Sequence, residues 1–569
     1  MNIQINMSEK TLQSSENSLS KKDIWTPLLL SSMVVVGIVV GLKLKNEPLV
    51  TVAPKEMDTK TEADEILGQG RMEEILRYVD AKYVDGVSDK ILVDKAINNL
   101  LQELDPHSVY IPADAIKDVS EDLEGEFEGV GIETIIIDDT INIITPLSNS
   151  PAATAGLMSG DKILSIGDSS AIGKDKRWFN TKLRGKKGTT LKLSVLRDNE
   201  SRPKVFTVTR DKVPVHSVDV ATILDDQTGY IKVSRFSANT TKEFILGLEK
   251  LVEKQGKKDL IIDLRQNPGG YLDKAVDVLS QLFKDKDKLL VYTKGRTVHR
   301  NEYKTNGRSR YEVGKVAILI DEGSASASEI VAGAVQDWDR GVIVGRRSFG
   351  KGLVQEPYSL KDGSELRLTV ARYFTPTGRS IQKPYKDQTK KQYQNEDDKR
   401  FERGELTIAD STHQTDSARF YTASGRLVYG GGGIQPDYFV PIEAVFKNDY
   451  FIQLKPWIHE YAYRYYSLFR KDIRFTDWQE YERNFRITDF AFNDFIKYTE
   501  RQGVPRQSNE ISSIREPIRK QLKARIARLI YGDEGYYGIL NDNDPVIGRA
   551  LELLKQKNPL GIKKIAKKQ

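Results

Sequence analysis

The sequence predicts a multidomain α/β protein, and three observations indicate this fold class. Apolar strand-like runs alternate with amphipathic helical patterns between residues 213 and 440, which is typical of a mainly parallel or mixed sheet with helical layers. Residues 121–212 consist of short β-type runs separated by glycines. The flanking regions, 61–118 and 441–569, show the apolar spacing of helices. A chain of 569 residues is long enough for roughly three or four such domains.

Composition narrows the classes of function. Hydrophobic residues make up 39% of the chain and charged residues 30%, as in an ordinary folded protein. The net charge of +6 is slight for this length and no base-reading motif accompanies it, so we expect no nucleic-acid partner. The absence of cysteine excludes disulfides, zinc thiolates and a cysteine nucleophile. A His-Glu pair at His459 lacks the second histidine of a zinc protease helix, and we expect no metal or other cofactor.

An uncharged apolar run from Ile24 to Leu42 is the strongest membrane signal. It is long enough to span the hydrocarbon core of a bilayer. A cleaved signal peptide would have a shorter core followed by a small-residue cleavage site, which this sequence lacks. We therefore predict a transmembrane signal anchor over 24–42, preceded by a tail at 1–23; a buried core helix is the alternative. Lysines flank the run on both sides, so charge alone does not set its orientation.

The remaining domains follow in order. The N-terminal helical region, 61–118, contains the turn signal Leu-Asp-Pro-His-Ser at 104–108, in which we expect His107 to be structural. The β-rich domain, 121–212, precedes an α/β core at 213–440, and the polar, charged stretch 383–425 is interpreted as an insertion or lid in that core. The helical C-terminal domain, 441–569, is rich in Tyr, Phe and Arg, and binding of an adaptor, substrate capture and self-association are all open roles for it.

The segment 316–355 carries the clearest chemical signal. The apolar run Val316–Ile320 leads into Gly-Ser-Ala-Ser-Ala-Ser-Glu at 323–329 and then into a helix. A helix start supplies free backbone N–H groups to a developing oxyanion, and strand, small-residue turn and helix is an arrangement that exposes nucleophiles. Lys351 follows between two glycines. A serine and this lysine suggest a catalytic dyad; the alternative is an N-capped helix start and a solvated lysine.

These two motifs resemble those of the carboxyl-terminal processing peptidases, also called tail-specific proteases. Lys351 lies 25 positions after Ser326, which is the family spacing, and Gln355 matches a family glutamine four residues beyond the lysine. The resemblance extends from about residue 105 to residue 437. It implies an α/β protease core with a Ser326–Lys351 dyad and with Gln355 holding the lysine in line.

The β-rich domain resembles a PDZ domain. Gly129, Val130, Gly131 and Ile132 match the loop that presents backbone N–H groups to a peptide's terminal carboxylate, and the peptide then adds as a strand to the sheet edge. The alternative is a β-domain whose glycines only make turns. Arg184, in a Leu-Arg-Gly segment, is our candidate for coupling peptide binding to the protease domain; the alternative is an ordinary surface arginine.

A Ser-Lys protease needs a lysine that is neutral near pH 7, whereas a free lysine titrates near pH ~10.4. We therefore expect Lys351 to lie in a largely dry site, because burial disfavours the ammonium form. Ala327 and either Gly269 or Gly270 are the candidate oxyanion-hole donors. None of the five histidines lies near Ser326 in sequence, and the Gly-x-Ser-x-Gly elbow of α/β-hydrolases is missing.

The sequence thus predicts a serine endopeptidase that cleaves exported proteins or precursors after its PDZ domain has bound their C-termini. The family resemblance implies a single-pass protein of the cytoplasmic membrane, in which the tail 1–23 is cytoplasmic and the catalytic part faces the periplasm or the cell exterior. Its expected partners are proteins or peptides with free C-termini. The alternative function is a catalytically inactive PDZ scaffold that captures C-termini without cutting them.

Overall fold

The computed structural model describes residues 70–147, 149–197, 200–386, 388–408 and 418–562. The predicted tail and membrane segment, residues 1–42, lie outside these ranges. Among the described helices, none combines the length and the apolar character that crossing a membrane requires. The chain divides into two units, one ending at Ile91 and the other starting at Leu92. The first contains α3 (Arg71–Lys82), and α4 (Asp89–Gln102) begins just before the division.

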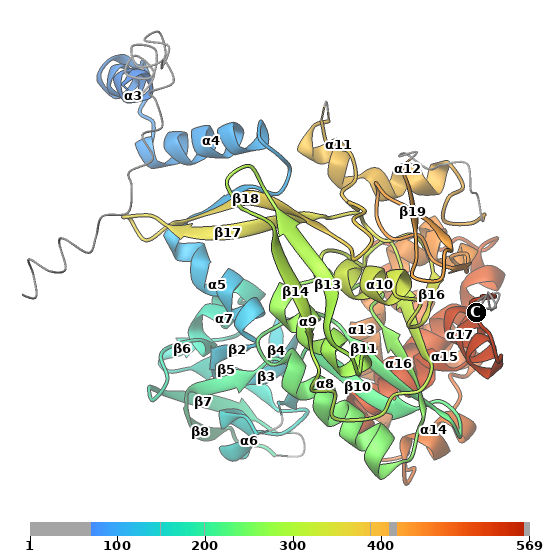
Figure 1. The fold of residues 1–569 in the computed structure, drawn as a ribbon. Helices are drawn as coiled ribbons and strands as arrows, with labels where there is room; N and C mark the ends of the chain where they lie inside the picture. Colours follow the sequence, from blue (N-terminus) through green and yellow to red (C-terminus); the bar gives the residue numbers. More distant parts are fainter. Residues whose placement is uncertain (1–69, 148, 198–199, 387, 409–417, 563–569) are drawn as a thin grey trace, which may run out of the picture. The chain divides into compact units, whose positions relative to one another are not determined.

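The β-rich region forms one sheet with the strand order β3-β4-β5-β7-β8, in which β6 pairs only with β5 (Figure 1). Its hairpin between β3 and β4 turns at Asp138 and Asp139, which both have positive φ, as a two-residue type I′ turn requires. Strand β3 lies at the edge of this sheet. The elements are β2 (Glu126–Gly129), β3 (Ile132–Ile137), β4 (Thr140–Pro146), α6 (Pro151–Thr154), β5 (Lys162–Ile166), β6 (Ser169–Ser170), α7 (Lys176–Leu183), β7 (Thr190–Leu196), β8 (Lys204–Thr209) and β9 (Asp211–Pro214).

The α/β core is built on a six-stranded sheet with the order β10-β11-β12-β15-β16-β21. All of its pairings are parallel except that between β10 and β11. Helices α8, α9 and α10 pack on one face of the sheet and α17 on the other, so the central strands are buried on both faces, as is typical of parallel sheets. The strands are β10 (Val218–Ile223), β11 (Thr228–Val233), β12 (Asp259–Asp263), β15 (Val316–Ile320), β16 (Val342–Gly345) and β21 (Tyr438–Phe439), and the helices are α8 (Thr240–Leu248), α9 (Leu272–Leu282), α10 (Ala327–Asp337) and α17 (Pro545–Lys555).

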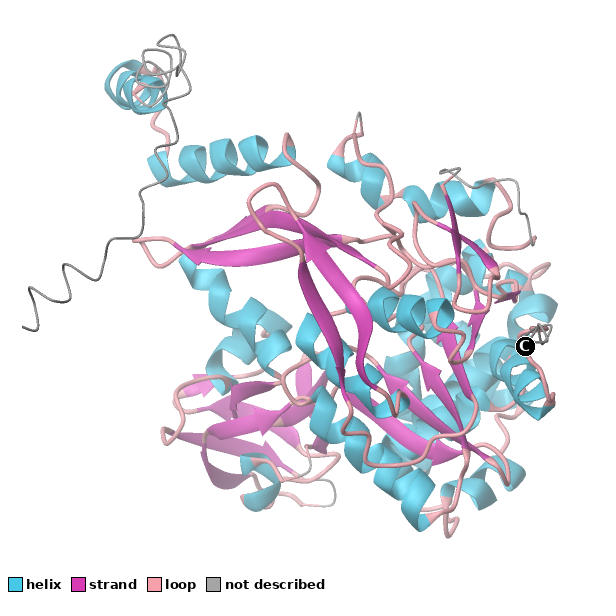
Figure 2. Ribbon diagram, in the orientation of Figure 1, coloured by secondary structure: helices cyan, strands magenta, loops and turns pink. Residues whose placement is uncertain are grey.

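A second, antiparallel sheet contains two long hairpins, β13–β14 and β17–β18 (Figure 2). The short strand β1 pairs with β18, which brings the chain just after residue 105 onto this sheet. Lys351 precedes β17 directly. The strands are β1 (Val109–Ile111), β13 (Lys286–Lys294), β14 (Asn301–Asn306), β17 (Leu353–Ser359) and β18 (Glu365–Phe374), and α5 (Ala113–Glu124) links β1 to the β-domain.

The predicted insertion, 383–425, carries helices α11 (Lys390–Gln394) and α12 (Glu396–Glu402) and strand β19 (Arg419–Tyr421), whose hairpin partner β20 (Leu427–Tyr429) lies just beyond it. It is fixed to the core by buried charges. Arg400 donates to the carbonyl of Arg347 at 2.7 Å, and Glu405 accepts from both arginines. The insertion is therefore packed against the segment that precedes Lys351.

The C-terminal region is helical, as predicted, and its first four helices share an aromatic-rich core. These helices also contact the β-domain, because Arg528 pairs with Glu133 at 2.9 Å and Arg464 with Asp138 at 2.8 Å. A non-helical residue, Gly532, kinks the longest helix. The helices are α13 (Asp449–Phe469), α14 (Trp478–Asn484), α15 (Asp489–Arg501) and α16 (Ile511–Asn541), and the last helix, α17, belongs by its packing to the α/β core.

Candidate active site

Ser326 lies where the loop after β15 enters α10. Its backbone has φ 54° and ψ −112°, a conformation that costs a residue with a side chain on the order of 1–3 kcal/mol. Strained turns of this kind cluster at functional sites, and a strand-to-helix turn presents a nucleophile. The next N–H, that of Ala327, is the first of the helix and carries no hydrogen bond within the described residues.

A buried carboxylate joins the segments that carry the serine and the lysine. Glu329 Oε2 accepts hydrogen bonds from the backbone N–H groups of Ser326 and Lys351, both at 2.8 Å. Its other oxygen accepts from Ser348 Oγ at 2.5 Å and from the N–H of Gly350 at 2.7 Å. Burial raises the pKa of Glu329 to about 7, against the lowering effect of these four donors. The carboxylate therefore holds the segments of Ser326 and Lys351 together.

Tyr373 on β18 makes a second connection between these segments. Its hydroxyl is fully buried, lies 3.0 Å from the carbonyl oxygen of Ser326 and also contacts the carbonyl oxygen of Lys351. The peptide units of both residues are therefore held by the core through their N–H and C=O groups alike.

Lys351 is half-buried, which is in the direction that the sequence predicts for a neutral base. Burial lowers the pKa of its amine below the ordinary value of 10.5, and Arg367 contributes in the same direction, whereas Glu329 and Asp105 oppose this effect. The amine donates to Gln355 Oε1 at 3.0 Å. Within the described residues, no hydrogen bond joins this amine to the Ser326 hydroxyl, and the two residues are connected through their backbones by Glu329.

Gln355 reaches the lysine from strand β17, where it pairs in register with Thr369 of β18. Its amide nitrogen donates to the backbone carbonyl of His107. The imidazole of His107 forms a hydrogen bond with Tyr393 Oη at 2.9 Å, and within the described residues it forms none with Ser326 or Lys351. Burial and the nearby Lys351 lower the pKa of this imidazole to about 3, so it is neutral at physiological pH.

The two glycines predicted for the oxyanion hole differ in what their N–H groups do. The N–H of Gly269 donates to Asn267 Oδ1 at 2.8 Å, which makes it a poor candidate donor to substrate. The N–H of Gly270 has no partner within the described residues. A Cβ at Gly270 would lie 2.1 Å from the carbonyl oxygen of Phe236, and φ there is 138°, so only glycine fits. The loop nevertheless lies against Ser326, because a Cβ at Gly269 would meet that of Ser326 at 2.8 Å.

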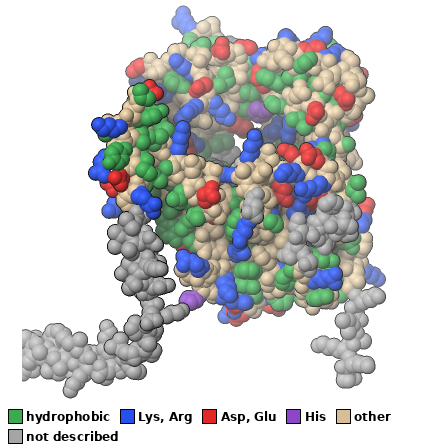
Figure 3. All heavy atoms as spheres, turned by 90° about the horizontal axis from the view of Figure 1, so that it is seen from above, with side chains coloured by type: hydrophobic (Ala, Val, Ile, Leu, Met, Phe, Trp, Pro, Cys, Tyr) green, Lys and Arg blue, Asp and Glu red, His purple; other side chains and the backbone are tan. Residues whose placement is uncertain are grey.

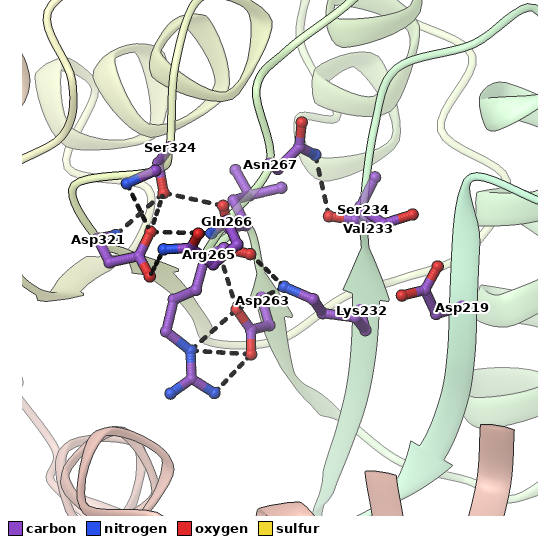
Figure 4. Close-up of polar contacts among 12 residues, drawn as sticks. Asp219, Lys232, Val233, Ser234, Asp263, Arg265, Gln266, Asn267, Asp321 and Ser324 are labelled. Carbon is purple, nitrogen blue, oxygen red and sulfur yellow. Dashed lines mark hydrogen bonds and ion pairs between the residues drawn. The ribbon is translucent and has the colours of Figure 1, made fainter. Parts of the chain in front are cut away.

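Hydrogen bonds beneath the nucleophile join the loops after β12 and β15 (Figure 4). Asp321 accepts from the N–H and the side-chain amide of Gln266 at 2.8 and 2.9 Å, and Ser324 Oγ donates to the carbonyl of Leu264 at 2.8 Å. Asn267 donates to the carbonyl of Val233 at 2.9 Å, which adds strand β11 to the network. The carboxyl ends of three adjacent parallel strands thus support the site, as expected for an α/β sheet.

The loop predicted to bind a peptide carboxylate connects β2 with the edge strand β3. The N–H groups of Val130 and Gly131 have no hydrogen-bond partner within the part of the chain that the structure describes. The carbonyls of the same two residues accept hydrogen bonds from the backbone N–H groups of Ala152 and Leu147, at 2.9 and 3.0 Å. These bonds fix the loop through its carbonyl groups and leave the N–H groups of Val130 and Gly131 available. Ile132 begins the edge strand and packs against the domain core, so the loop and edge expected of a peptide site occur together.

Among the described residues, Arg184 forms no hydrogen bond or ion pair with the predicted protease core. It lies at the end of α7, donates to Asp118 at 2.6 Å and to Glu121, and packs over the ring of Phe127. Both acids belong to α5, the helix between β1 and the β-domain. The ion pairs of Arg184 thus attach the end of α7 to this linking helix.

Sequence reasoning missed Glu329, Tyr373 and Asp105 as members of the site. A signal existed for Glu329, since Ser326 followed by Glu329 has the spacing of a helix capping box. No comparable pattern marks Tyr373, which is one of many tyrosines in the chain.

The distribution of charged side chains on the surface bears on nucleic acid as a partner. On the face shown in Figure 3, basic side chains are interspersed with acidic and apolar ones. The described part of that face thus lacks the continuous basic field that tracks a nucleic-acid backbone.

Parts of this chain match known families and proteins. Residues 227–390 match the model of peptidase family S41, residues 129–204 that of the PDZ domain, and residues 450–532 a family of unknown function, DUF8443. The carboxy-terminal processing protease CtpB of Bacillus subtilis (strain 168) is 34% identical over 352 residues, which cover 61% of this chain and 72% of the relative. A carboxy-terminal-processing protease of Bartonella bacilliformis (strain ATCC 35685 / KC583 / Herrer 020/F12,63) is 35% identical over 337 residues, or 58% of this chain and 76% of the relative. A solved structure of a photosystem II D1 C-terminal processing protease is 29% identical, covers 54% of this chain and 82% of its own, and has a TM-score of 0.31.

Proposed function

The chain belongs to the S41 family of carboxy-terminal processing serine proteases, and from this premise we propose that it cleaves exported proteins or precursors after its PDZ domain has bound their free C-termini. One observation carries the catalytic part of the proposal. Glu329 Oε2 accepts from the backbones of Ser326 and Lys351 alike, so the nucleophile and a buried amine belong to one site.

The proposed acylation step uses the neutral amine of Lys351 as a general base. The amine takes the proton from Ser326 Oγ, which attacks the scissile carbonyl carbon and forms a tetrahedral intermediate. The developing oxyanion is stabilised by the N–H groups of Ala327 and Gly270, which are unpaired in the described structure. The ammonium of Lys351 then gives its proton to the leaving amine, the C–N bond breaks, and an ester of Ser326 remains.

Deacylation reverses these roles with water in place of the leaving amine. Lys351, neutral again, takes a proton from a water molecule that attacks the ester carbonyl. The ammonium returns the proton to Ser326 Oγ as the C–O bond breaks, which releases the new carboxyl terminus. Burial of Lys351 serves both steps, because it favours the neutral amine on which each step depends.

Recognition of the substrate's C-terminus is assigned to the loop Gly129–Ile132. The unused N–H groups of Val130 and Gly131 suit a terminal carboxylate, and the free edge of β3 suits main-chain pairing with the last residues of the peptide. The core of the domain next to this edge is apolar, which favours an apolar C-terminal side chain.

Peptide binding is proposed to align the dyad, whose two groups are not hydrogen bonded in the described structure. The contacts of Arg184 with α5 support a route for this effect. Helix α5 follows β1 directly, β1 pairs with β18, and the residues just before β1 contact Gln355. A shift of the PDZ domain would thereby reach the glutamine that holds Lys351.

We further propose that residues 24–42 anchor the chain in the cytoplasmic membrane, with the protease on the periplasmic or outer side. The length and lack of charge of this run support the anchor. Two experiments test this proposal. Extraction of isolated membranes with alkaline carbonate tests the anchor, and treatment of intact spheroplasts with an added protease tests the side on which the catalytic domain lies. Release by carbonate, or protection of the catalytic domain from added protease, would contradict it.

The test of the enzymatic function uses the full chain in detergent and an unstructured substrate protein with an apolar C-terminus. Wild type is compared with Ser326→Ala and Lys351→Ala, and products are identified by mass spectrometry. We expect cleavage by wild type alone, and slower cleavage of a substrate whose C-terminus is amidated. Cleavage that survives Ser326→Ala would exclude this mechanism. Tight C-terminal binding by all three proteins without cleavage would instead support the scaffold function.

A further inference from the structure

The turn Asp105–Ser108 lies against the hairpin that carries Gln355. Asp105 is buried, and its Oδ1 accepts from the N–H groups of His107 and Ser108, both at 2.8 Å, and from Thr369 Oγ1 at 3.1 Å. Its Oδ2 accepts from Ser108 Oγ at 2.6 Å. The Ser108 hydroxyl in turn accepts from the N–H of Thr369 at 3.1 Å. The carboxylate of Asp105 thus stabilises the turn and also binds it to Thr369 of β18.

The position of this turn matters because Thr369 is the residue opposite Gln355 in the hairpin. The turn therefore brings the carbonyl oxygen of His107 to the Gln355 side chain, where that oxygen accepts a hydrogen bond from the amide nitrogen. A carbonyl oxygen can only accept, so it selects one of the two orientations of the amide. In the selected orientation, Oε1 faces the amine of Lys351, at 3.0 Å.

The orientation of this amide has a chemical consequence for a lysine that acts as a base. A neutral amine has two N–H groups and one lone pair, and the lone pair must face the serine hydroxyl. When Gln355 presents Oε1, it takes an N–H of the amine and leaves the lone pair free. When the amide is reversed, its NH₂ group donates to the lone pair and removes the base from use.

We propose that Asp105 is a positioning residue for peptide cleavage, because it holds the His107 carbonyl where that carbonyl fixes the amide of Gln355 with its oxygen toward Lys351. The inference rests on the Ser326–Lys351 mechanism proposed above. Asp105 itself touches neither the substrate nor the reacting atoms. Its influence passes through two steps. The hydrogen bonds of Asp105 hold the turn, and the carbonyl of His107 in that turn then orients the amide of Gln355.

The test is a double-mutant cycle in the full-length protein. Limiting kcat, KM and the Kd of a C-terminal peptide are measured for wild type, Asp105→Ala, Gln355→Leu and the double variant, at the high-pH plateau of activity. We expect Asp105→Ala to lower kcat by about 10- to 100-fold, with KM and peptide Kd unchanged. In the Gln355→Leu background there is no amide to orient, so Asp105→Ala should change kcat by less than about twofold.

Two further variants separate positioning from general stability. Asp105→Asn keeps an acceptor for the two N–H groups of the turn, and we expect it to restore most of the activity. Asp362→Ala is the matched control, because Asp362 caps a similar turn at the other end of the hairpin, accepting from the N–H of Ser364 at 3.0 Å and from its hydroxyl at 2.5 Å. We expect this control to cleave at the wild-type rate.

Three outcomes would overturn the inference: a wild-type kcat in Asp105→Ala, an equal loss in the presence and absence of Gln355, or a loss confined to KM. If Asp105→Ala does not fold, the same cycle is run with Ser108→Ala, which removes the hydroxyl between Asp105 and Thr369. Failure of the dyad mechanism itself is distinguishable, because cleavage would then survive Ser326→Ala. Loss of cleavage in Ser326→Ala together with full activity in Asp105→Ala refutes only the positioning role.

Discussion

Glu329 and Lys351 are joined by a hydrogen bond of 2.8 Å from the backbone N–H of the lysine to Oε2 of the buried carboxylate. The same oxygen accepts from the N–H of Ser326, at the same distance. A carboxylate has only acceptor sites, which suits a position that faces four donors. The side chain of Lys351 is thus free for chemistry while its backbone is fixed.

Glu329→Gln should impair cleavage for this reason. An amide keeps the shape of the side chain but places an NH₂ group against two of the four donors, and buried donors without a partner cost about 1–3 kcal/mol. We expect at least a tenfold lower kcat, corresponding to about 1.4 kcal/mol in the barrier, together with a lower melting temperature. Kinetics and thermal unfolding measure these effects. A variant as active and as stable as wild type would show that the Glu329 carboxylate is not needed to hold the segments of Ser326 and Lys351 together.

The pH dependence of cleavage should follow the amine of Lys351. Since burial lowers its pKa below 10.5 and the neutral form is the base, kcat/KM should rise with pH through an acidic limb that lies below that value. Gln355→Glu places a carboxylate 3.0 Å from the amine in place of an amide oxygen and so favours the ammonium. We expect the acidic limb to move upward by at least about one pH unit. A limb that stays in place, or moves to lower pH, would argue against Lys351 as the titrating group.

Gly131→Ala should abolish peptide recognition without affecting the dyad. Gly131 has φ 73°, and a Cβ there would lie 2.4 Å from that of Ser150, so the loop must move to accept it. We expect at least a tenfold weaker affinity for an apolar C-terminal peptide, measured by fluorescence anisotropy, with unchanged basal cleavage. Gly173→Ala is the matched control, because φ is 70° but no described residue places an atom within 4 Å of the new Cβ. Equal peptide affinity in the two variants would show that the loop Gly129–Ile132 does not bind the peptide.

The parts of this site that can be predicted from the sequence are those whose residues lie close together along the chain. Ser326, Lys351 and Gln355 occur within a stretch of the chain that also has the apolar pattern of β15 and α10, and the structure places the lysine amine against the glutamine. The contact of Gln355 with His107 joins positions 248 residues apart and arises only when β1 pairs with β18. The packing of α17 on the core sheet is equally remote in sequence. An amphipathic pattern shows that a helix has an apolar face, but not which surface covers it.

The last prediction concerns Arg184, which the sequence singles out and the structure places on α5. Its guanidinium contacts Asp118 and Glu121, and the burial of Glu121 raises the pKa of that carboxyl while Arg184 opposes the rise. If α5 transmits peptide binding to the dyad, Arg184→Ala should leave peptide affinity unchanged and reduce the stimulation of cleavage by a C-terminal peptide at least about threefold. Glu121→Gln should have the same effect, and the double variant should add little to either single change.

The matched control is Arg177→Ala, because Arg177 also lies on α7 but is exposed to solvent. Basal and peptide-stimulated rates are measured for each variant with one substrate, and peptide Kd is measured separately. Unchanged basal and stimulated rates in Arg184→Ala, with unchanged peptide affinity, would show that this arginine is an ordinary surface residue. A loss of peptide affinity would instead place Arg184 in the binding site, since coupling between sites requires that binding itself survive the substitution.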